Sequence, residues 1–257
     1  MIRICVLASG SKGNSVFIES ERTSILIDAG LSGKEIRQRL LCIGAHPGQL
    51  SALIVTHEHA DHVKGVGVLS RQHELPVYIT EPTYHAASSM LKQVEHVHFF
   101  RDGVSFKVGD LTIRPYASSH DAVDPVNFTV SNGNVKLGLA TDLGFASALT
   151  RNCLRNCHAL ILETNHDREM LRLGPYPEPL KQRILSRLGH LSNDQAAELL
   201  ADLDHLDLRH VFLAHLSEAN NLADKAVSAV GGVLKAKSTK TAIHVCSQDR
   251  PSTEAYI

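Results

Sequence analysis

The sequence predicts a mixed α/β protein in which layered β-sheets carry helices on their outer faces. Three observations support this fold class. In the first and last thirds of the chain, short runs rich in isoleucine, valine and leucine alternate with amphipathic segments. The middle of the chain has the pattern and the turn residues of consecutive strands. No low-complexity linker interrupts the pattern, so we expect one layered domain over residues 1–257.

The first third of the chain supplies three strand and helix pairs. The strand "SILIDAG" precedes the helix "GKEIRQRLLCIG", "ALIVTH" precedes "HVKGVGVLSRQHE", and "LPVYIT" precedes "YHAASSMLKQV". Each strand is a short apolar run, and each helical segment is amphipathic. This alternation is typical of layered α/β folds.

The middle of the chain predicts two β-hairpins, and the last third returns to alternation. "VSFKVGDLTIRPYASSH" and "VNFTVSNGNVKLGLATD" each contain two strands, and Asn132-Gly133 predicts a two-residue turn in the second pair. The strands "ALILET" and "HVFLAH" follow, with a final helix over "LADKAVSAVGGVL". Between these strands we expect a helix from about Pro179 to Leu188 and another after Ser192, where Gln195 completes a capping box.

Composition narrows the class of protein. The chain is 43% hydrophobic and 21% charged, and no run approaches the roughly 18 apolar residues of a membrane span, so we expect no membrane association. The first apolar run is too short for a secretory signal, and five scattered cysteines suit reduced thiols, so we expect a cytoplasmic location. A net charge of -1 gives no general attraction to nucleic acid, which would need a local site. The sequence does not determine an oligomeric state.

Nearly every apolar run ends in a residue that can bind a metal ion or a proton. If those strand ends share one edge of the sheets, their side chains converge on a single site carried by loops on a rigid scaffold. The residues are Asp28, His57, His120, Asp142, Glu163 and His215.

The densest local signal is "THEHADH", which follows one of these strands in a chain with 16 histidines. It places four candidate ligands, His57, His59, Asp61 and His62, within six positions. They cannot all reach one ion from a regular helix or strand, whereas a loop can turn His57 and His59 toward one ion and Asp61 and His62 toward another. The pattern therefore predicts two metal ions.

The pattern HxHxDH formed by these four residues resembles the signature of the metallo-β-lactamase superfamily. The resemblance covers essentially the whole chain and implies an αββα sandwich, in which two mixed β-sheets flanked by helices share the site at one edge. It also implies a set of roles. A first ion is bound by His57, His59 and His120, a second by Asp61, His62 and His215; Asp142 bridges both, and Asp28 is a supporting residue.

Two such ions can activate water and stabilise the charge of a hydrolytic transition state, so the ligand set predicts a hydrolase. Imidazoles and carboxylates suit zinc, manganese or iron. "SGSKGNS" resembles the first loop of the YycJ/WalJ group, and five later stretches resemble that group in the same order: "LIDAGLSGKEI", "ETNHD", "YPEPLKQRI", "GHLSN" and "LAHLSEANN". The resemblance implies a nuclease with 5′-to-3′ exonuclease action on DNA, favoured over RNA, and a role in DNA repair. A more distant similarity to ribonuclease Z involves the loops that contain Glu163 and His190.

A phosphate site is also favoured by the residues before and after His190. The helix after Ser192 offers free N–H groups, and Arg183 and Arg187 lie one helical turn apart just upstream. We expect activated water to attack phosphorus, His190 to protonate the departing oxygen, and Glu163 to orient His190. Asp61 is expected to act in catalysis as well as in metal binding, and His166 to shape the substrate pocket. A solvated helix face is the alternative for the two arginines, and a structural role is the alternative for His166.

Two other functions remain open from the sequence. A hydrolase of small phosphodiesters, thioesters or lactones could use the same metal centre, and the neutral overall charge favours it. A non-catalytic binding protein could keep the fold, but we would expect such a protein to have lost a ligand, and none is missing.

Overall fold

The computed structural model describes residues 1–203, 207–236 and 240–257. Its strands form two seven-stranded mixed β-sheets. The first sheet has the order β14 (Ala255–Tyr256), β1 (Arg3–Ala8), β2 (Ser15–Glu19), β3 (Ser24–Ile27), β4 (Ala52–Ile54), β5 (Val77–Ile79) and β6 (Val97–Phe99). The second has the order β13 (Ala242–Val245), β12 (His210–Ala214), β11 (Ala159–Glu163), β10 (Lys136–Ala140), β9 (Val126–Ser131), β8 (Leu111–Ala117) and β7 (Phe106–Val108).

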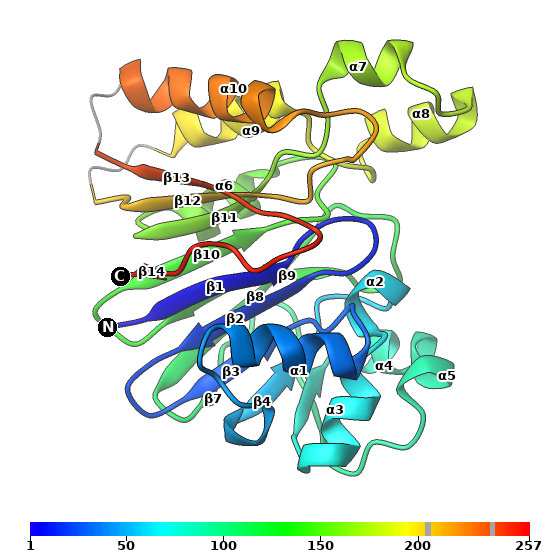
Figure 1. Ribbon diagram of the computed structural model, residues 1–257, viewed down its shortest axis with the longest axis vertical. Helices are drawn as coiled ribbons and strands as arrows, with labels where there is room; N and C mark the ends of the chain where they lie inside the picture. Colours follow the sequence, from blue (N-terminus) through cyan, green and yellow to red (C-terminus); the bar gives the residue numbers. More distant parts are fainter. Residues whose placement is uncertain (204–206, 237–239) are drawn as a thin grey trace.

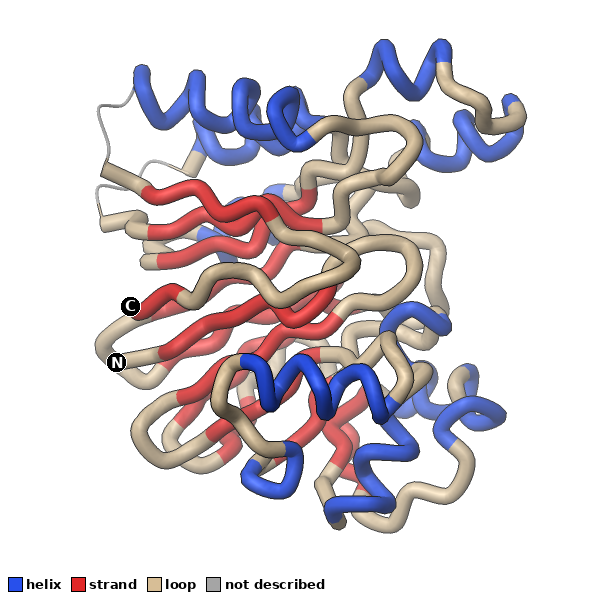
Figure 2. The backbone as a smooth tube through the Cα atoms, in the orientation of Figure 1, coloured by secondary structure: helices blue, strands red, loops and turns tan. Residues whose placement is uncertain are grey.

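Helices cover the outer face of each sheet, which gives four layers (Figures 1 and 2). The helices of the first half are α1 (Gly33–Cys42), α2 (Ala60–Val63), α3 (Val66–His73), α4 (Glu81–Ala86) and α5 (Ser88–Leu91), with a 3-10 helix at Pro47–Gln49. Those of the second half are α6 (Ala148–Leu154), α7 (Arg168–Leu173), α8 (Glu178–Leu185), α9 (Asn193–Asp202) and α10 (Ala223–Ala236). The predicted αββα architecture is confirmed.

Three apolar clusters hold these layers together, because each sheet is apolar on both faces. Ile4, Ile54 and Phe128 belong to the cluster between the sheets. A second cluster joins the first sheet to α1 and α3, and a third joins the other sheet to α9 and α10. In the part of the chain that the structure describes, no helix has both the length and the apolar character that a membrane crossing needs.

The topology explains why the functional residues meet. Strands β3 to β6 are parallel, and so are β10 to β13. Parallel neighbours need crossover connections, which here are the helices, and their carboxyl ends therefore lie at one edge of each sheet. These two edges face the same side of the molecule, away from both termini (Figure 1).

Local predictions differ from the structure in three respects. The helices expected over "HVKGVGVLSRQHE" and "YHAASSMLKQV" are each divided, the first between α2 and α3 and the second between α4 and α5. The hairpin at Asn132-Gly133 closes over four residues, because Ser131 pairs with Lys136. Its Asn132 side chain accepts from the amides of Asn134 and Val135, which widens the turn, and of these turn residues only Gly133 has positive φ, whereas a type I′ turn needs two.

The third difference concerns the helix expected from about Pro179 to Leu188, which ends at Leu185 as α8. The chain then folds back, and His190 donates its backbone N–H to the carbonyl of Ile184. A Cβ on Gly189 would lie 2.2 Å from that carbonyl oxygen, so only glycine allows this crossing. The early end of the helix brings His190 to the edge where the parallel strands finish.

Candidate metal centre

The strand-end residues singled out in the sequence lie together at this edge. Asp28 follows β3, Asp142 follows β10 and His215 follows β12, and all three have left-handed backbones with φ of 58°, 51° and 56°. Such a conformation is uncommon for residues other than glycine and persists where the surrounding contacts hold it. The backbone at the site is therefore tightly constrained.

His57, His59 and His120 form one group whose facing ring nitrogens lie within 4.8 Å of one another. His57 is buried, with its Nδ1 2.9 Å from the hydroxyl of Thr56, and its Nε2 has no hydrogen-bond partner among the described residues. The Nδ1 of His120 lies 3.3 Å from the carbonyl of Gly189. These contacts leave the Nε2 atoms of His57 and His120 facing the centre of the group.

Asp61, His62 and His215 form a second group, whose candidate ligand atoms also lie within 4.8 Å of one another. The Oδ2 of Asp61 lies 3.5 Å from Nε2 of His62 and 3.9 Å from Nε2 of His215. These three residues come from the start of α2 and the end of β12, so the group joins the two sheets.

Asp142 lies between the two groups. Its Oδ2 is 3.3 Å from Nε2 of His62, and its Oδ1 is 3.7 Å from Nε2 of His215 and 3.9 Å from Nε2 of His120. The carboxylate is buried, and Oδ2 forms no hydrogen bond with the described residues. One oxygen or the other thus faces both groups.

Asp28 and Glu163 orient the imidazoles from behind. Asp28 accepts from the Thr56 amide and hydroxyl, and its Oδ2 lies 2.8 Å from Nδ1 of His62. Glu163 is fully buried, with Oε1 3.0 Å from Nδ1 of His215 and 2.7 Å from Nδ1 of His190. Its Oε2 accepts from the backbone amides of Leu143 and Leu191, so both of its oxygens contact neighbouring polar groups.

Replacing Asp28 with asparagine is expected to weaken the binding of one divalent ion by about 10- to 100-fold, because its single acceptor oxygen could not serve both the Thr56 amide and Nδ1 of His62. Asparagine tolerates the left-handed backbone, so the fold should persist. Isothermal titration with zinc or manganese measures the loss, and D102N, at an exposed turn aspartate, serves as the control. Equal affinities in both variants would show that Asp28 does not hold His62.

The carboxylates and imidazoles at the centre shift one another's pKa. Burial opposes ionisation of Asp61 and Asp142, but His215 and His62 outweigh it and lower the pKa of both carboxyls. Burial likewise opposes charge on His62 and His215, yet Asp142 and the other facing carboxylates raise the pKa of both rings. The pKa of His57 and of His120 is lowered, chiefly by burial, which keeps these two rings neutral and able to bind metal.

The buried atoms at the centre fit divalent metal. His57 Nε2, Asp142 Oδ2 and His215 Nε2 are all buried, face one another across the two groups and lack hydrogen-bond partners among the described residues. Unpaired buried polar atoms are costly, and metal ions bound in the two groups would satisfy these three atoms. Nitrogen and carboxylate oxygen without thiolate suit zinc, manganese and iron.

The first loop of the chain supports the second group in a way that sequence reasoning missed. The Nδ2 of Asn14 donates to Oδ2 of Asp61 at 3.1 Å and lies 3.1 Å from Nε2 of His62. Ser9 accepts the backbone N–H of His215 at 2.7 Å. The stretch "SGSKGNS" carried the family resemblance, but nothing local in it indicates contact with residues about 50 and 200 positions away.

A close backbone approach holds this loop in place. The backbone N–H of Asn14 donates to the backbone carbonyl of Asp61, and a Cβ on Gly30 would lie only 1.6 Å from that same oxygen. G30A is expected to lower the free energy of unfolding by about 1–3 kcal/mol, because the loop must move. G232A, where nothing lies within 4 Å of the added Cβ in α10, should instead be neutral or stabilising by up to about 1 kcal/mol. Urea denaturation compares them, and equal stability would contradict the close packing.

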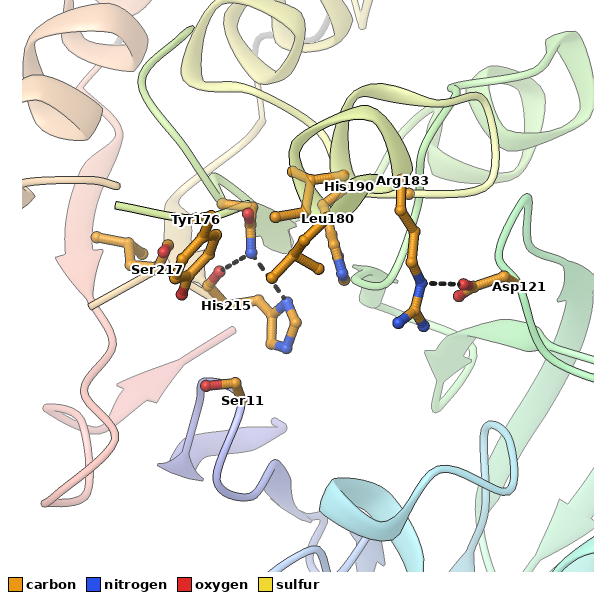
Figure 3. A pocket seen from close by; sticks show the side chains of 12 residues that line it. Ser11, Asp121, Tyr176, Leu180, Arg183, His190, His215 and Ser217 are labelled. Atoms are coloured by element: carbon orange, nitrogen blue, oxygen red, sulfur yellow. Dashed lines mark hydrogen bonds and ion pairs between the residues drawn. The ribbon is translucent and has the colours of Figure 1, made fainter. Parts of the chain in front are cut away.

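A pocket opens beside His190 and His215, and Figure 3 shows it from close by. It has a volume of about 240 Å³, and its lining includes His190, His215, Arg183 and Tyr176. His190 is partly exposed to the pocket, while its Nδ1 is held by Glu163. This arrangement places an imidazole supported by a buried carboxylate next to the candidate metal ligands.

The structure places the other predicted substrate residues differently from one another. Arg183 lines the pocket and pairs with Asp121. Arg187 lies over the ring of Phe145, with its guanidinium carbon 4.1 Å from the ring centre. The hydroxyl of buried Ser192 caps α9 and accepts from Arg168. His166 is buried beside the start of α9, and burial lowers its pKa to about 4.

A two-sheet sandwich with clustered histidines and carboxylates at its shared edge defines the class of metal-dependent hydrolases. Residues 23–216 match the family model described as "Beta-lactamase superfamily domain", and the chain belongs to the metallo-β-lactamase superfamily. This confirms the resemblance seen in HxHxDH, together with the class of enzyme that it implies.

Two curated relatives are similar over most of the chain. Exodeoxyribonuclease YycJ of Bacillus anthracis is 39% identical, covering 92% of this chain and 90% of the relative. Exodeoxyribonuclease WalJ of Streptococcus pneumoniae is 40% identical over 86% and 84%. Ribonuclease Z of Mycobacterium sp. (strain KMS), 24% identical over 77% of this chain and 79% of the relative, confirms the predicted distant similarity.

The fold itself is shared with the crystal structure of YhfI from Bacillus subtilis, a metallo-β-lactamase fold protein. The two have a TM-score of 0.75 over 98% of this chain and 99% of that one, at 16% sequence identity.

Proposed function

We propose that this protein is an exonuclease that hydrolyses phosphodiester bonds of DNA with two divalent metal ions. The observation that carries the proposal is the placement of His190, whose Nδ1 lies 2.7 Å from Glu163, in a pocket that His215 of the second group also lines. The ring centre of His190 lies 5.3 Å from that of His120 in the first group. The named activity of the two relatives with 39% and 40% identity supports the same reaction.

The first ion would be held by His57, His59 and His120, and the second by Asp61, His62 and His215, with Asp142 shared. Bound divalent ions lower the pKa of water and stabilise negative charge on phosphoryl oxygens. Zinc and manganese suit these ligands, and iron also fits.

Side chains of the protein would donate and accept the protons of the reaction. His190 donates a proton to the departing oxygen, and the Glu163 carboxylate keeps its Nδ1–H in place and stabilises the charged ring. Asp61 is 24% exposed at the open side of the centre, whereas Asp142 is 6% exposed, so Asp61 is the carboxylate better placed to accept a proton from the attacking water. Arg183 would neutralise phosphate charge at the pocket wall.

The test is hydrolysis of end-labelled single- and double-stranded DNA, of matched RNA, and of a small aryl phosphodiester, a thioester and a lactone, with D142A as the control. We expect metal-dependent release of nucleotides from a DNA end, faster than from RNA, and starting at the 5′ end as the resemblance implies. Turnover of thioester or lactone alone would refute the nuclease and favour the small-substrate hydrolase.

Two further expectations stay proposals. All five cysteines are unpaired, as a reducing cytoplasm would favour. The cluster between the sheets draws on both halves of the chain, which supports one domain over residues 1–257.

A further inference from the structure

The wall of the pocket comes from a segment that contributes little to the core. Between β11 and α9 the chain forms α7 and α8, which extend beyond the sheets (Figure 1). Only Leu171 and Ile184 are buried in these two helices, while Leu173 and Leu185 are largely exposed. The stability of the fold therefore does not explain this segment.

The pocket side of the segment is apolar and aromatic. Tyr176, Leu180 and Ile184 line the pocket at spacings of four residues, and Tyr176 and Leu180 are only half-buried. Within the described residues, Tyr176 forms no hydrogen bond and no ring pair, and in Figure 3 its ring lies across from Ser11, on the same side of the pocket as His215. An unpaired aromatic ring facing a pocket is a platform on which a nucleic-acid base can stack.

A cation lies at the other end of the same pocket. Arg183 is bound to Asp121 through Nε alone, at 2.5 Å, so both terminal nitrogens of its guanidinium are available. Asp121 Oδ1 in turn lies 3.5 Å from Nε2 of His120, so the Arg183–Asp121 pair lies next to a candidate metal ligand. A guanidinium with two free terminal nitrogens suits bidentate binding of a phosphate.

The charge of the segment agrees with an anionic ligand. Residues 168–187 contain five basic and two acidic side chains, in a chain whose net charge is -1. Of the five basic residues Arg183 lines the pocket, and the excess of positive charge in the segment favours the approach of a nucleic-acid backbone.

The size of the pocket limits what can enter. Its volume of about 240 Å³ is below the roughly 300–1,000 Å³ of common small-molecule sites, so it suits one nucleoside unit and not a base pair. We propose that the segment from α7 to α8 seats the terminal, unpaired nucleotide of the strand, with its base stacked on Tyr176 and a neighbouring phosphate bound by Arg183. This inference rests on the proposed nuclease function and adds that the enzyme takes a frayed or single-stranded end.

Equilibrium binding tests the proposal separately from hydrolysis. Full-length protein in chelator is titrated with fluorescent DNA that ends in a normal overhang, in an overhang with an abasic last nucleotide, or in a cross-linked blunt pair. Y176A is expected to weaken binding of the normal overhang by roughly 5- to 150-fold, the range found for loss of one base stack, and to leave the abasic end unchanged. Y176F should bind like the wild type, and L173A, an exposed neighbour outside the pocket, is the control.

Several results would overturn the proposal: equal losses on normal and abasic ends, no loss with Y176A, or a cross-linked blunt end bound as tightly as the overhang. R183A should weaken binding of both overhangs and reduce the dependence of affinity on salt by about one phosphate contact. If the metal-loaded protein hydrolyses DNA but Y176A does not change DNA binding, only this inference is refuted. If binding depends on the terminal base and on Tyr176 but no nucleic acid is hydrolysed, only the proposed function is refuted.

Discussion

D142A should lose both tightly bound metal ions and nearly all hydrolysis. Asp142 is the only carboxylate that we place between the two groups, with oxygens 3.3 Å from His62, 3.7 Å from His215 and 3.9 Å from His120. Its charge is also the largest attraction that raises the pKa of both His62 and His215 against burial, so its removal changes the protonation of both rings.

We expect metal affinity to fall by more than about 100-fold, because a shared ligand should matter more than an orienting partner. Turnover should fall by about 1,000-fold or more, since several kcal/mol of charge stabilisation depend on the ions. Metal content by mass spectrometry and turnover of end-labelled DNA measure both effects, with D102A as the control for loss of an exposed aspartate. Two ions bound with wild-type affinity would refute the shared position.

H190A should behave in the opposite way, keeping both ions while turnover falls by about 100- to 10,000-fold. The reason is that the two groups of metal-binding residues are complete without His190, and that Glu163 would still be held by His215 and by the amides of Leu143 and Leu191. The fold and the positions of the ligands should therefore survive the substitution.

Metal content and kcat must be measured on the same preparation of H190A. H96A, at an exposed histidine before the edge strand β6, controls for the loss of an imidazole. If metal content collapses in H190A, His190 is a ligand or a structural support and cannot be assigned the proton transfer.

Many residues of the candidate metal centre could be predicted, because they follow directly after predicted strands. His57, His59, Asp61 and His62 are contiguous, and the strand-end positions of His120, Asp142 and His215 follow from short apolar runs. Among the groups of candidate ligands that lie within 4.8 Å of one another in the described residues are the two that the resemblance implies, and the roles of their members stay a prediction. Helix ends and turns were less predictable, because Gly189 and Asn132 act through backbone contacts that periodicity does not describe.

The positioning residues depended on contacts between distant segments. Asn14 meets Asp61 only because the first loop crosses the start of α2, and Glu163 serves His215 as well as His190 only because β11 and β12 are parallel neighbours. Tyr176 lies between α7 and α8, and only the fold places it in a pocket with Arg183.

The sequence by itself determined the superfamily, the α/β layering and the residue types available for metal binding, because these depend on local hydrophobic periodicity and on one compact motif. Only the tertiary structure decided which imidazole each carboxylate orients and which side chains enclose the substrate pocket. These contacts join residues tens to hundreds of positions apart, and their distances are set by strand order and by close backbone approaches such as that at Gly30.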